Sequence, residues 1–342
     1  MMTRWLALFL LTATVSFADD WPWWRGPNRN AVAPGTKAPP LKWSAKENIL
    51  WKADVPGRGH GSPILWGSRV MLATADDEAQ VQSLLCFDRD TGRQLWKTDI
   101  HKGGFVPLHK KNSHSSSTPA CDGELVFIPF AVQDALWLTA LNLDGKIVWQ
   151  KNLGDFKSMH GYAASPVLHG SLVIVAGDSL EKSFLIALQR RTGEVVWKTN
   201  RGNYDKGNYS SPVVGRVACR DQLLLPGPYK TYSYDPVTGQ TLWTCDGPSS
   251  AANTTIVHDK ERVYSSGGFP QRNLLCIRAD GTNDVTATHL VWSVERNACY
   301  IPSLLLNDGL LYMAHDTGKF VCFNADDGKE IWSQKLDGGF SS

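Results

Sequence analysis

The chain has 342 residues and a formal net charge of +2, with 42% hydrophobic and 20% charged residues. That composition is typical of a folded globular protein and excludes a disordered chain. The small net charge, without a long run of Lys or Arg, excludes an extended nucleic-acid-binding surface. The chain also contains 14 Trp residues, and so many large rings need a repeated structural reason.

Residues 1–18 have the pattern of a secretory signal peptide. Arg4 supplies a positive charge, the apolar run at 5–15 is too short to span a bilayer, and Ser16 and Ala18 are small residues at the −3 and −1 positions of a cleavage site. We expect cleavage near Ala18 and a periplasmic or secreted protein without a membrane span. The alternative is a buried N-terminal helix or strand.

Residues 19–47 form a Pro- and Trp-rich segment, which cannot be one regular strand or helix. We expect Trp21, Trp23 and Trp24 to fix this segment across one face of the fold, with Arg25 stacked or paired. A strap that binds a partner protein is the alternative.

The rest of the chain repeats one motif. A turn of the type Thr-Gly or Asp-Gly is followed by a short apolar run that ends in Trp, as in "DTGRQLW" and "DDGKEIW". Two copies keep the tail without the glycine. The copies recur at intervals of about 40 to 53 residues, which indicates a repeat architecture. The seven tryptophans are Trp51, Trp96, Trp149, Trp197, Trp243, Trp292 and Trp332.

A second signal lies between the tryptophans. Segments of small residues, often ending in proline, include "GHGSPIL", "SSSTPAC", "YAASPVL" and "NYSSPVV". Each unit reads as four short strands, placed in the third unit at 163–168, 171–176, 183–189 and 194–199. Four-stranded units of this length predict an all-β protein, a β-propeller over residues 48–342. A solenoid of stacked hairpins is the competing arrangement.

Six complete units run from Trp51 to Trp332. The "NILW" segment at Trp51 is predicted to be only the last strand of a unit, because no earlier strands precede it. We expect a seven-bladed ring truncated at the C-terminus, in which that strand completes the last blade. The alternative is closure with six blades, with the Trp51 strand paired elsewhere.

The seven cysteines do not suggest a disulfide framework. Cys86, Cys276 and Cys322 occupy one position of the repeat, where Ala140 and Ala187 stand in other units. This indicates a small buried site filled by Ala or Cys. One disulfide among Cys121, Cys219, Cys245 and Cys299 stays open, and the pairing cannot be read from spacing.

These residues carry a family resemblance. The unit with Ala or Cys, a Thr-Gly or Asp-Gly turn and a final Trp resembles the tryptophan-docking repeat of PQQ-like β-propellers. That family includes quinoprotein alcohol dehydrogenases and the propeller lipoprotein of the outer-membrane assembly machinery. The opening "DWPWWRGPNRNAVAP" is similar to a narrower group of exported bacterial repeat proteins. The resemblance implies that each repeated tryptophan packs between neighbouring blades.

The resemblance does not bring catalytic residues with it. The quinoprotein dehydrogenases have adjacent cysteines near the quinone and an acidic set that holds Ca²⁺, whereas this chain has no Cys-Cys pair. We therefore expect no cofactor, and PQQ with Ca²⁺ only if the chain is a small quinoprotein. Asp88 and Asp90 in "DRDTG" are expected to stabilise a turn, because that turn offers too few oxygens for Ca²⁺.

Candidate binding residues lie in the loops before the first strand of each unit. We expect these loops at the mouth of the central channel, where converging imidazoles could bind a metal or an acidic ligand. The alternative is that each histidine bonds to its own loop, so no metal site is predicted. The candidates are His60, His109, Lys111, Asn112, His114, His160 and Tyr209.

From these features we expect a non-catalytic, monomeric scaffold that binds other envelope proteins. This functional expectation rests on the fold alone. The first alternative is a small PQQ-dependent oxidoreductase, and the second is a protein that binds a small molecule or polysaccharide at the channel mouth.

Overall fold

The computed structural model describes residues 20–34, 38–204, 208–295 and 297–340. The predicted signal peptide lies outside these ranges. In the described chain the regular structure is almost entirely β, and α1 is a single turn at Thr286–His289. No helix among the described residues is long and apolar enough to cross a membrane.

The strands form six antiparallel sheets in chain order, which we call blades one to six. Blades one to three contain β1 (Ile64–Trp66), β2 (Arg69–Asp76), β3 (Val81–Asp88) and β4 (Gln94–Lys102); β5 (Ala120–Cys121), β6 (Leu125–Val132), β7 (Ala135–Asn142) and β8 (Ile147–Asp155); β9 (Val167–His169), β10 (Leu172–Gly177), β11 (Ser183–Gln189) and β12 (Val195–Gly202). Blades four to six contain β13 (Val213–Val217), β14 (Arg220–Gly227), β15 (Lys230–Tyr234) and β16 (Thr241–Asp246); β17 (Val257–His258), β18 (Arg262–Gly267), β19 (Asn273–Arg278) and β21 (Leu290–Glu295); β22 (Leu305–Asn307), β23 (Leu310–Ala314), β24 (Lys319–Asn324) and β25 (Glu330–Lys335).

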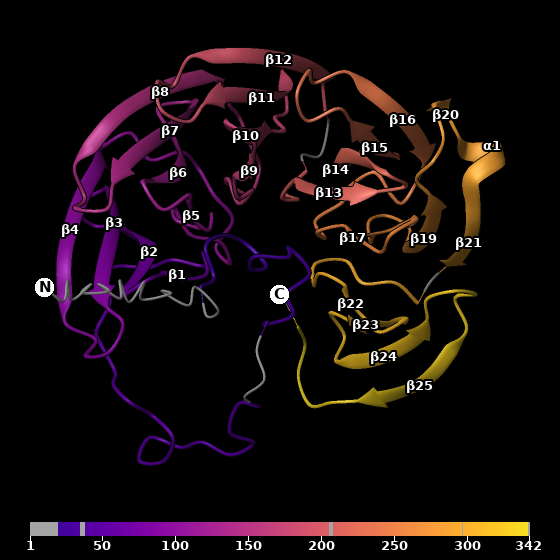
Figure 1. The fold of residues 1–342 in the computed structure, drawn as a ribbon, viewed down its shortest axis with the longest axis horizontal. Helices are drawn as coiled ribbons and strands as arrows, with labels where there is room; N and C mark the ends of the chain where they lie inside the picture. The colour runs from indigo at the N-terminus through magenta and orange to yellow at the C-terminus, as the bar shows by residue number, and fades with distance from the viewer. Residues whose placement is uncertain (1–19, 35–37, 205–207, 296, 341–342) are drawn as a thin grey trace, which may run out of the picture.

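The six blades follow one another around a centre, with the first strand of each blade innermost and the last strand outermost (Figure 1). One short extra strand, β20 (Asn283–Asp284), pairs with the outer strand β16 of blade four. The prediction of repeated four-stranded propeller blades is therefore confirmed. The ribbon leaves an opening between blades six and one, and a ring of seven blades stays a prediction.

The predicted strands of the third unit lie within a few residues of the observed ones, because the turns between them are well marked in the sequence. The first differs most: it was expected at 163–168, and β9 spans Val167–His169. The expected strand at "NILW" is wrong, since residues 48–51 belong to no strand of the described chain. Trp51 nevertheless contacts blade one, as described below.

In blades one, two, four and six, the turn between the third and fourth strands is built by an Asp or Asn side chain and a glycine. In blade one, Oδ1 of Asp88 accepts hydrogen bonds from the backbone nitrogen of Thr91 at 2.9 Å and from its hydroxyl at 2.7 Å. These bonds lower the pKa of Asp88, because they stabilise its charged form. Gly92 closes the turn with a φ of 72°. Asp88 thus stabilises a turn, as expected.

The position opposite each tryptophan is small and fully buried. Cys86, Ala140, Ala187, Cys276 and Cys322 face the repeated tryptophan across the outer strand pair, and each is 0% exposed. All seven cysteines of the chain are free thiols, so none of the open pairings forms. The repeated Cys or Ala therefore serves packing in the core.

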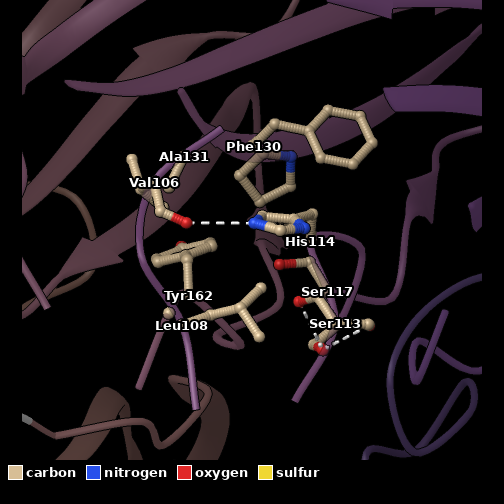
Figure 2. Close-up of a pocket in the computed structure, with 11 residues that line it drawn as sticks. Val106, Leu108, Ser113, His114, Ser117, Phe130, Ala131 and Tyr162 are labelled. Atoms are coloured by element: carbon tan, nitrogen blue, oxygen red, sulfur yellow. Dashed lines mark hydrogen bonds between the residues drawn. The ribbon is translucent and has the colours of Figure 1, made fainter. Parts of the chain in front are cut away.

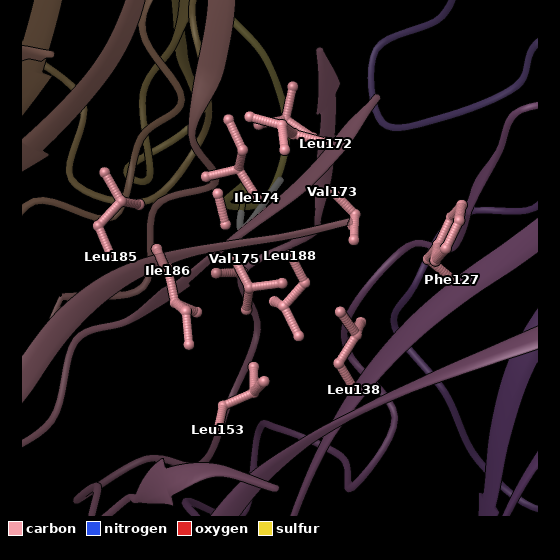
Figure 3. Packing of buried hydrophobic residues seen from close by; sticks show 14 of the residues in the cluster. Phe127, Leu138, Leu153, Leu172, Val173, Ile174, Val175, Leu185, Ile186 and Leu188 are labelled. Atoms are coloured by element: carbon pink, nitrogen blue, oxygen red, sulfur yellow. The ribbon is translucent and has the colours of Figure 1, made fainter. Parts of the chain in front are cut away.

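The core continues from sheet to sheet. Between blades two and three, Phe127 and Leu138 pack toward Val173, Val175 and neighbouring aliphatic side chains (Figure 3). All four named side chains are 0% exposed. Strands whose both faces pack in this way explain the near-continuous apolar runs of the inner strands.

A tryptophan and a glycine join neighbouring blades. Nε1 of Trp96 donates to the carbonyl of Leu143 in the next blade at 3.0 Å. A Cβ placed on Gly145 would lie 2.7 Å from the Trp96 ring, so only glycine fits there. The same pair of contacts recurs four more times, for Trp51 with Gly92, Trp149 with Gly193, Trp197 with Gly239 and Trp292 with Gly328.

Two of the seven tryptophans depart from the expected contact. Nε1 of Trp243 donates to Gln222 within its own blade at 2.7 Å. Gln222 in turn donates to the carbonyl of Ala279 in blade five at 2.9 Å, so a glutamine mediates this contact. Trp332 is 41% exposed, because no described blade follows it.

The N-terminal segment lies across the inner strands. The backbone of Trp21 pairs with Leu65 in blade one, and the carbonyl of Pro22 accepts from Cys121 in blade two. Arg29 donates to the carbonyl of Leu168 in blade three at 2.7 Å, and its guanidinium stacks on the Trp23 ring at 4.7 Å. Trp24 and Arg25 extend the contacts to Thr255 and Leu304 in blades five and six. The segment thereby ties five blades together.

Candidate functional site

The loops that join the outer strand of one blade to the inner strand of the next form one face of the molecule, which we call the mouth face. The small residues in these loops turn out to be structural. The backbone nitrogen of Ser62 donates to the hydroxyl of Thr118 at 2.9 Å. In the same way, the backbone nitrogen of Thr118 donates to the hydroxyl of Ser165 at 3.0 Å, and that of Ser165 donates to the hydroxyl of Ser211 at 2.9 Å. Thr255 and Ser303 repeat the contact. This chain of hydroxyls explains the second sequence signal as scaffold.

Three of the candidate side chains meet on the mouth face. The rings of His109 and His160 lie 5.3 Å apart in an edge-to-face arrangement, and His160 lies 5.6 Å from the ring of Tyr209. They come from three successive loops, leading into blades two, three and four. We call these three residues the mouth row.

Hydrogen bonds from the loop backbone fix the mouth row. Asn112 donates from its side chain to the carbonyl of His160 at 2.6 Å and receives a bond from Ser116 at 2.6 Å. The backbone nitrogen of Lys111 donates to Nδ1 of His109 at 3.2 Å, which leaves the proton of that ring on Nε2. Asn112 thus acts as a positioning residue for the row.

The mouth row is only partly covered. His109 is exposed, whereas His160 and Tyr209 are half-buried. Nδ1 of His160 is buried and has no hydrogen-bond partner among the described residues. Burial raises the pKa of the Tyr209 phenol, so this group is a neutral donor at ordinary pH. The row therefore offers polar aromatic rings to a partner.

The other candidates do not join the row. His60 is exposed and contacts the neighbouring loop through its backbone nitrogen, which donates to Ser115 at 2.9 Å. His114 faces the carboxylate of Asp77 at 2.9 Å. It also faces the carbonyl of Val106 at 3.0 Å (Figure 2). Both ring nitrogens of His114 therefore already face a hydrogen-bond acceptor. For these two histidines the alternative of separate loop contacts describes the structure.

Two hollows flank the mouth row. The first is lined by Val106, Leu108, His114 and Tyr162 among others, and its cavity of about 10 Å³ has room for one water molecule at most (Figure 2). The second is lined by Tyr209, Asp178 and Asn208 among others and encloses no cavity of that size. Gly161 lies between them and belongs to both linings. No three His, Cys, Asp or Glu side chains of the described ranges converge as a metal site requires.

A buried ionic network lies beside the second hollow, and sequence reasoning missed it. Arg201 and Asp178, with side chains 0% and 3% exposed, form two bonds of 2.8 and 3.2 Å. Arg201 also donates to Tyr234, and Asn208 donates to Asp178 at 2.6 Å. Burial acts to lower the pKa of Arg201, but Asp178 holds it well above its usual value. Arg201 lies within β12, whereas Asp178 and Asn208 lie in loops, so these residues share no repeated spacing that a periodic pattern could reveal.

Exposed apolar side chains lie on the mouth face and on two hairpin loops beside it. The backbone nitrogen of Tyr229 donates to the carbonyl of Ser249 at 2.7 Å, and the carbonyl of Phe269 accepts from the backbone nitrogen of Ala251 at 3.2 Å, so both hairpins contact the loop into blade five. The rings of Tyr300 and Phe269 lie 6.2 Å apart between centroids and are tilted by 38°. The loop residues Met159, Tyr229, Phe269 and Ile301 are 56%, 59%, 46% and 38% exposed. Tyr, Phe and Met are the residue types enriched where proteins bind one another.

Comparison with known proteins agrees with this architecture. Residues 41–179, 82–297 and 232–342 each match the family described as outer membrane protein assembly factor BamB. Tetrathionate hydrolase of Acidithiobacillus ferrooxidans is 23% identical over 330 residues, covering 85% of this chain and 62% of that protein. The quinoprotein alcohol dehydrogenase PedH of Pseudomonas putida is 30% identical over 123 residues, covering 32% of this chain and 18% of that protein. The chain thus spans less than two thirds of each.

Solved structures show the same fold at low identity. The quinohemoprotein alcohol dehydrogenase from Comamonas testosteroni superposes with a TM-score of 0.60 and 13% identity, over 81% of this chain and 59% of that one. BamB from Moraxella catarrhalis superposes with a TM-score of 0.56 and 17% identity, over 81% of each chain. The family matches together extend over residues 41–342, and the chain belongs to the BamB family of PQQ-like β-propeller proteins.

Proposed function

We propose that this chain is a non-catalytic β-propeller that is exported to the cell envelope and binds other proteins there through its mouth face. The observation that carries the proposal is the mouth row, His109, His160 and Tyr209, beside exposed apolar residues. Aromatic and Met side chains on rigid loops are suited to protein recognition. The family description, an outer membrane assembly factor, supports an envelope role.

The signal-peptide pattern of residues 1–18 supports export. Within the envelope, we expect the chain to act as a monomer that presents the mouth face to its partner. The blades hold the loops in fixed positions, so a partner binds a preformed surface. Preformed surfaces lose little conformational entropy on binding.

A PQQ-dependent oxidoreductase is the rival function, supported by the fold shared with quinohemoprotein dehydrogenases. The residues at the mouth do not fit PQQ with Ca²⁺. Asp178, the carboxylate that lines the second hollow, is already bonded by Arg201 and Asn208 and is not available to a cation. A calcium ion needs six to eight oxygen ligands.

The proposal is tested by two measurements on one preparation. The purified chain is first mixed with PQQ and Ca²⁺ and assayed for dye reduction with alcohols and sugars, where we expect no turnover. The immobilised chain is then exposed to an envelope extract, beside variants Tyr209→Ala and Met159→Glu and the outer-strand control Val196→Glu.

We expect a bound protein that both mouth-face variants lose and the control retains. Dye reduction would contradict the proposal in favour of the oxidoreductase. Retention of the bound protein by both mouth-face variants would contradict the placement on this face. A glycan or small molecule that competes for the row would instead support binding at the channel mouth.

A further inference from the structure

The N-terminal segment carries two arginines into the interior of the molecule, where it crosses the inner strands of the blades (Figure 1). Residues 23–31 form a compact coil, which is closed by a hydrogen bond of 2.9 Å from the backbone nitrogen of Ala31 to the carbonyl of Arg25. Arg25 is 6% exposed, and burial lowers its pKa to about 10. Burial lowers the pKa of Arg29 to about 10 as well. Both guanidiniums are therefore positively charged at neutral pH, although little water reaches them.

Neither arginine has a carboxylate partner among the described residues. Arg25 donates to the carbonyl of Leu304, and Arg29 donates to the carbonyl of Leu168 at 2.7 Å. No neighbouring negative charge offsets the effect of burial on their pKa values. The buried Arg201, by contrast, is paired with a carboxylate at 2.8 Å. Because a buried charge without an opposite charge costs free energy, the place of Arg25 and Arg29 favours an added negative charge.

The carboxylate that comes nearest in the argument is already engaged. Burial and the charge of Arg29 both lower the pKa of His258, which places these two side chains near each other. Asp259 follows His258 in the chain, but its carboxylate accepts from Arg262 at 3.0 Å and from Tyr264 at 2.9 Å. Asp259 therefore does not neutralise Arg29.

Three unpaired donors line one hollow between the coil and the inner part of blades three and four. They are Nε of Arg25, Nε of Arg29 and Nε1 of Trp23, all of them buried and without a hydrogen-bond partner among the described residues. Each of these groups can only donate. The hollow has room of about 10 Å³, which is enough for one particle of about the size of a water molecule. We call it the donor hollow.

The walls of the donor hollow on the blade side are mostly apolar. Pro166 and Val167 line it from blade three, and Pro212 and Val213 line it from blade four. The two prolines have no backbone N–H, so the polar character of the hollow comes mainly from the coil. Ser165 adds a hydroxyl that accepts from Thr118 and can donate its own proton.

We propose that the donor hollow binds one monovalent anion of the size of chloride, held by the N–H groups of Arg25, Arg29 and Trp23. A water molecule accepts only about two hydrogen bonds and brings no charge, whereas a halide accepts from all three donors. Sulfate and phosphate, with four oxygens each, are too large for this room. The anion joins the N-terminal segment to blade four, which the hydrogen bonds described above leave out.

The test compares two salts at one ionic strength. The full chain is purified in sodium gluconate, whose anion is too large for the hollow, and its thermal unfolding is followed in about 0.2 M gluconate and in about 0.2 M chloride. We expect a melting temperature about 2–4 °C higher in chloride, because an ion that binds only the folded chain stabilises it. The rise should saturate in slope against the logarithm of chloride concentration.

Variants assign the effect to the donor hollow. Arg25→Met should lose the difference between the two salts. The matched control is Arg190→Met, because Arg190 is paired with Asp122 at 2.9 Å, and it should keep the difference. If Arg25→Met does not fold, Trp23→Phe is used instead, since it keeps a ring and removes one donor; the difference should then shrink.

Equal melting temperatures in the two salts would overturn the proposal, because the hollow would then hold water. A difference that Arg25→Met or Trp23→Phe retains in full would also overturn it. Crystals grown in bromide supply a second measurement, in which an anomalous signal is expected between Arg25 and Trp23. Bromide at this place without any effect of chloride on unfolding would mean an adventitious ion only, and would likewise contradict the proposal.

Discussion

At the scale of single residues, the contact between a turn glycine and a tryptophan ring holds neighbouring blades together. The glycine is needed twice: its φ is positive, and the ring leaves no space for a Cβ. In Gly193, φ is 70° and a Cβ would lie 2.8 Å from the Trp149 ring. The two requirements can be tested separately, because other glycines of the chain have a positive φ but have space for a Cβ.

Gly193→Ala should lower the free energy of unfolding by about 2–4 kcal/mol, from backbone strain and from overpacking against Trp149. Gly170 is the matched control, because its φ is 54° and nothing lies within 4 Å of the added Cβ. Gly170→Ala should cost only about 1–2 kcal/mol. Urea unfolding measures both, and equal losses would show that the tryptophan contact contributes nothing.

A second residue-scale prediction concerns acid. Burial beside Phe130 and Trp137 lowers the pKa of His101 to about 4. As pH falls, His101 is therefore protonated at a higher pH in the unfolded chain than in the folded chain. Its contribution to the free energy of unfolding is complete above about pH 6.5 and is lost between pH 6.5 and 4. The loss amounts to about 2–3 kcal/mol.

His101→Phe keeps a ring in this place and cannot take up a proton. The fall in unfolding free energy from pH 7 to pH 4 should therefore be smaller in the variant than in the natural chain. Other histidines also respond to acid, so the difference between the two proteins is the measured quantity. Identical pH profiles would refute the assigned role of His101.

At the scale of elements, blade four shows how the repeat changes while the fold persists. Here Ser233 stands opposite Trp243, where other blades have Ala or Cys. Gln222 accepts from Ser233 at 2.6 Å and from Trp243, and its amide donates to the carbonyl of Ala279. The polar residues come as a set, because each buried group needs a partner.

Gln222→Leu should destabilise the protein by about 2–4 kcal/mol, since it leaves the buried Trp243 nitrogen and the buried Ser233 hydroxyl without their acceptor. Gln150→Leu is the control, because the side chain of Gln150 makes a single hydrogen bond, to Thr139, on an outer strand. It should cost less than about 1 kcal/mol. Thermal unfolding compares the two, and similar losses would contradict the network.

The elements that the sequence predicts well are those that repeat. The Thr-Gly turns and the alternation of apolar residues predict the positions of β11 and the outer strands. The turns depend on local backbone geometry, and the alternation depends on which side chains are buried. The segment at 48–51 was predicted to be a strand from the same motif, yet a strand needs a neighbour to pair with. Local pattern alone does not supply that neighbour.

At the scale of the whole molecule, the sequence again predicts one part of the candidate site and misses another. The sequence led to the loops that hold His109, His160 and Tyr209, because these loops break the repeat. It could not tell which rings meet, since that depends on the distance around the blades. Nor could it indicate the pair Arg201 and Asp178, which lies 23 residues apart in the chain and depends on two different strand ends.

The division between a repeated scaffold and a non-repeated mouth face is the central claim. It is tested most directly by a photo-crosslinking amino acid, introduced one position at a time at exposed sites of the exported chain. Met159, Tyr229 and Ile301 sample the mouth face, whereas Leu95, Val148 and Val196 sample the outer strands. We predict that adducts with an envelope protein form from the mouth face and disappear in the Tyr209→Ala background. Adducts that form mainly from the outer strands would contradict the account.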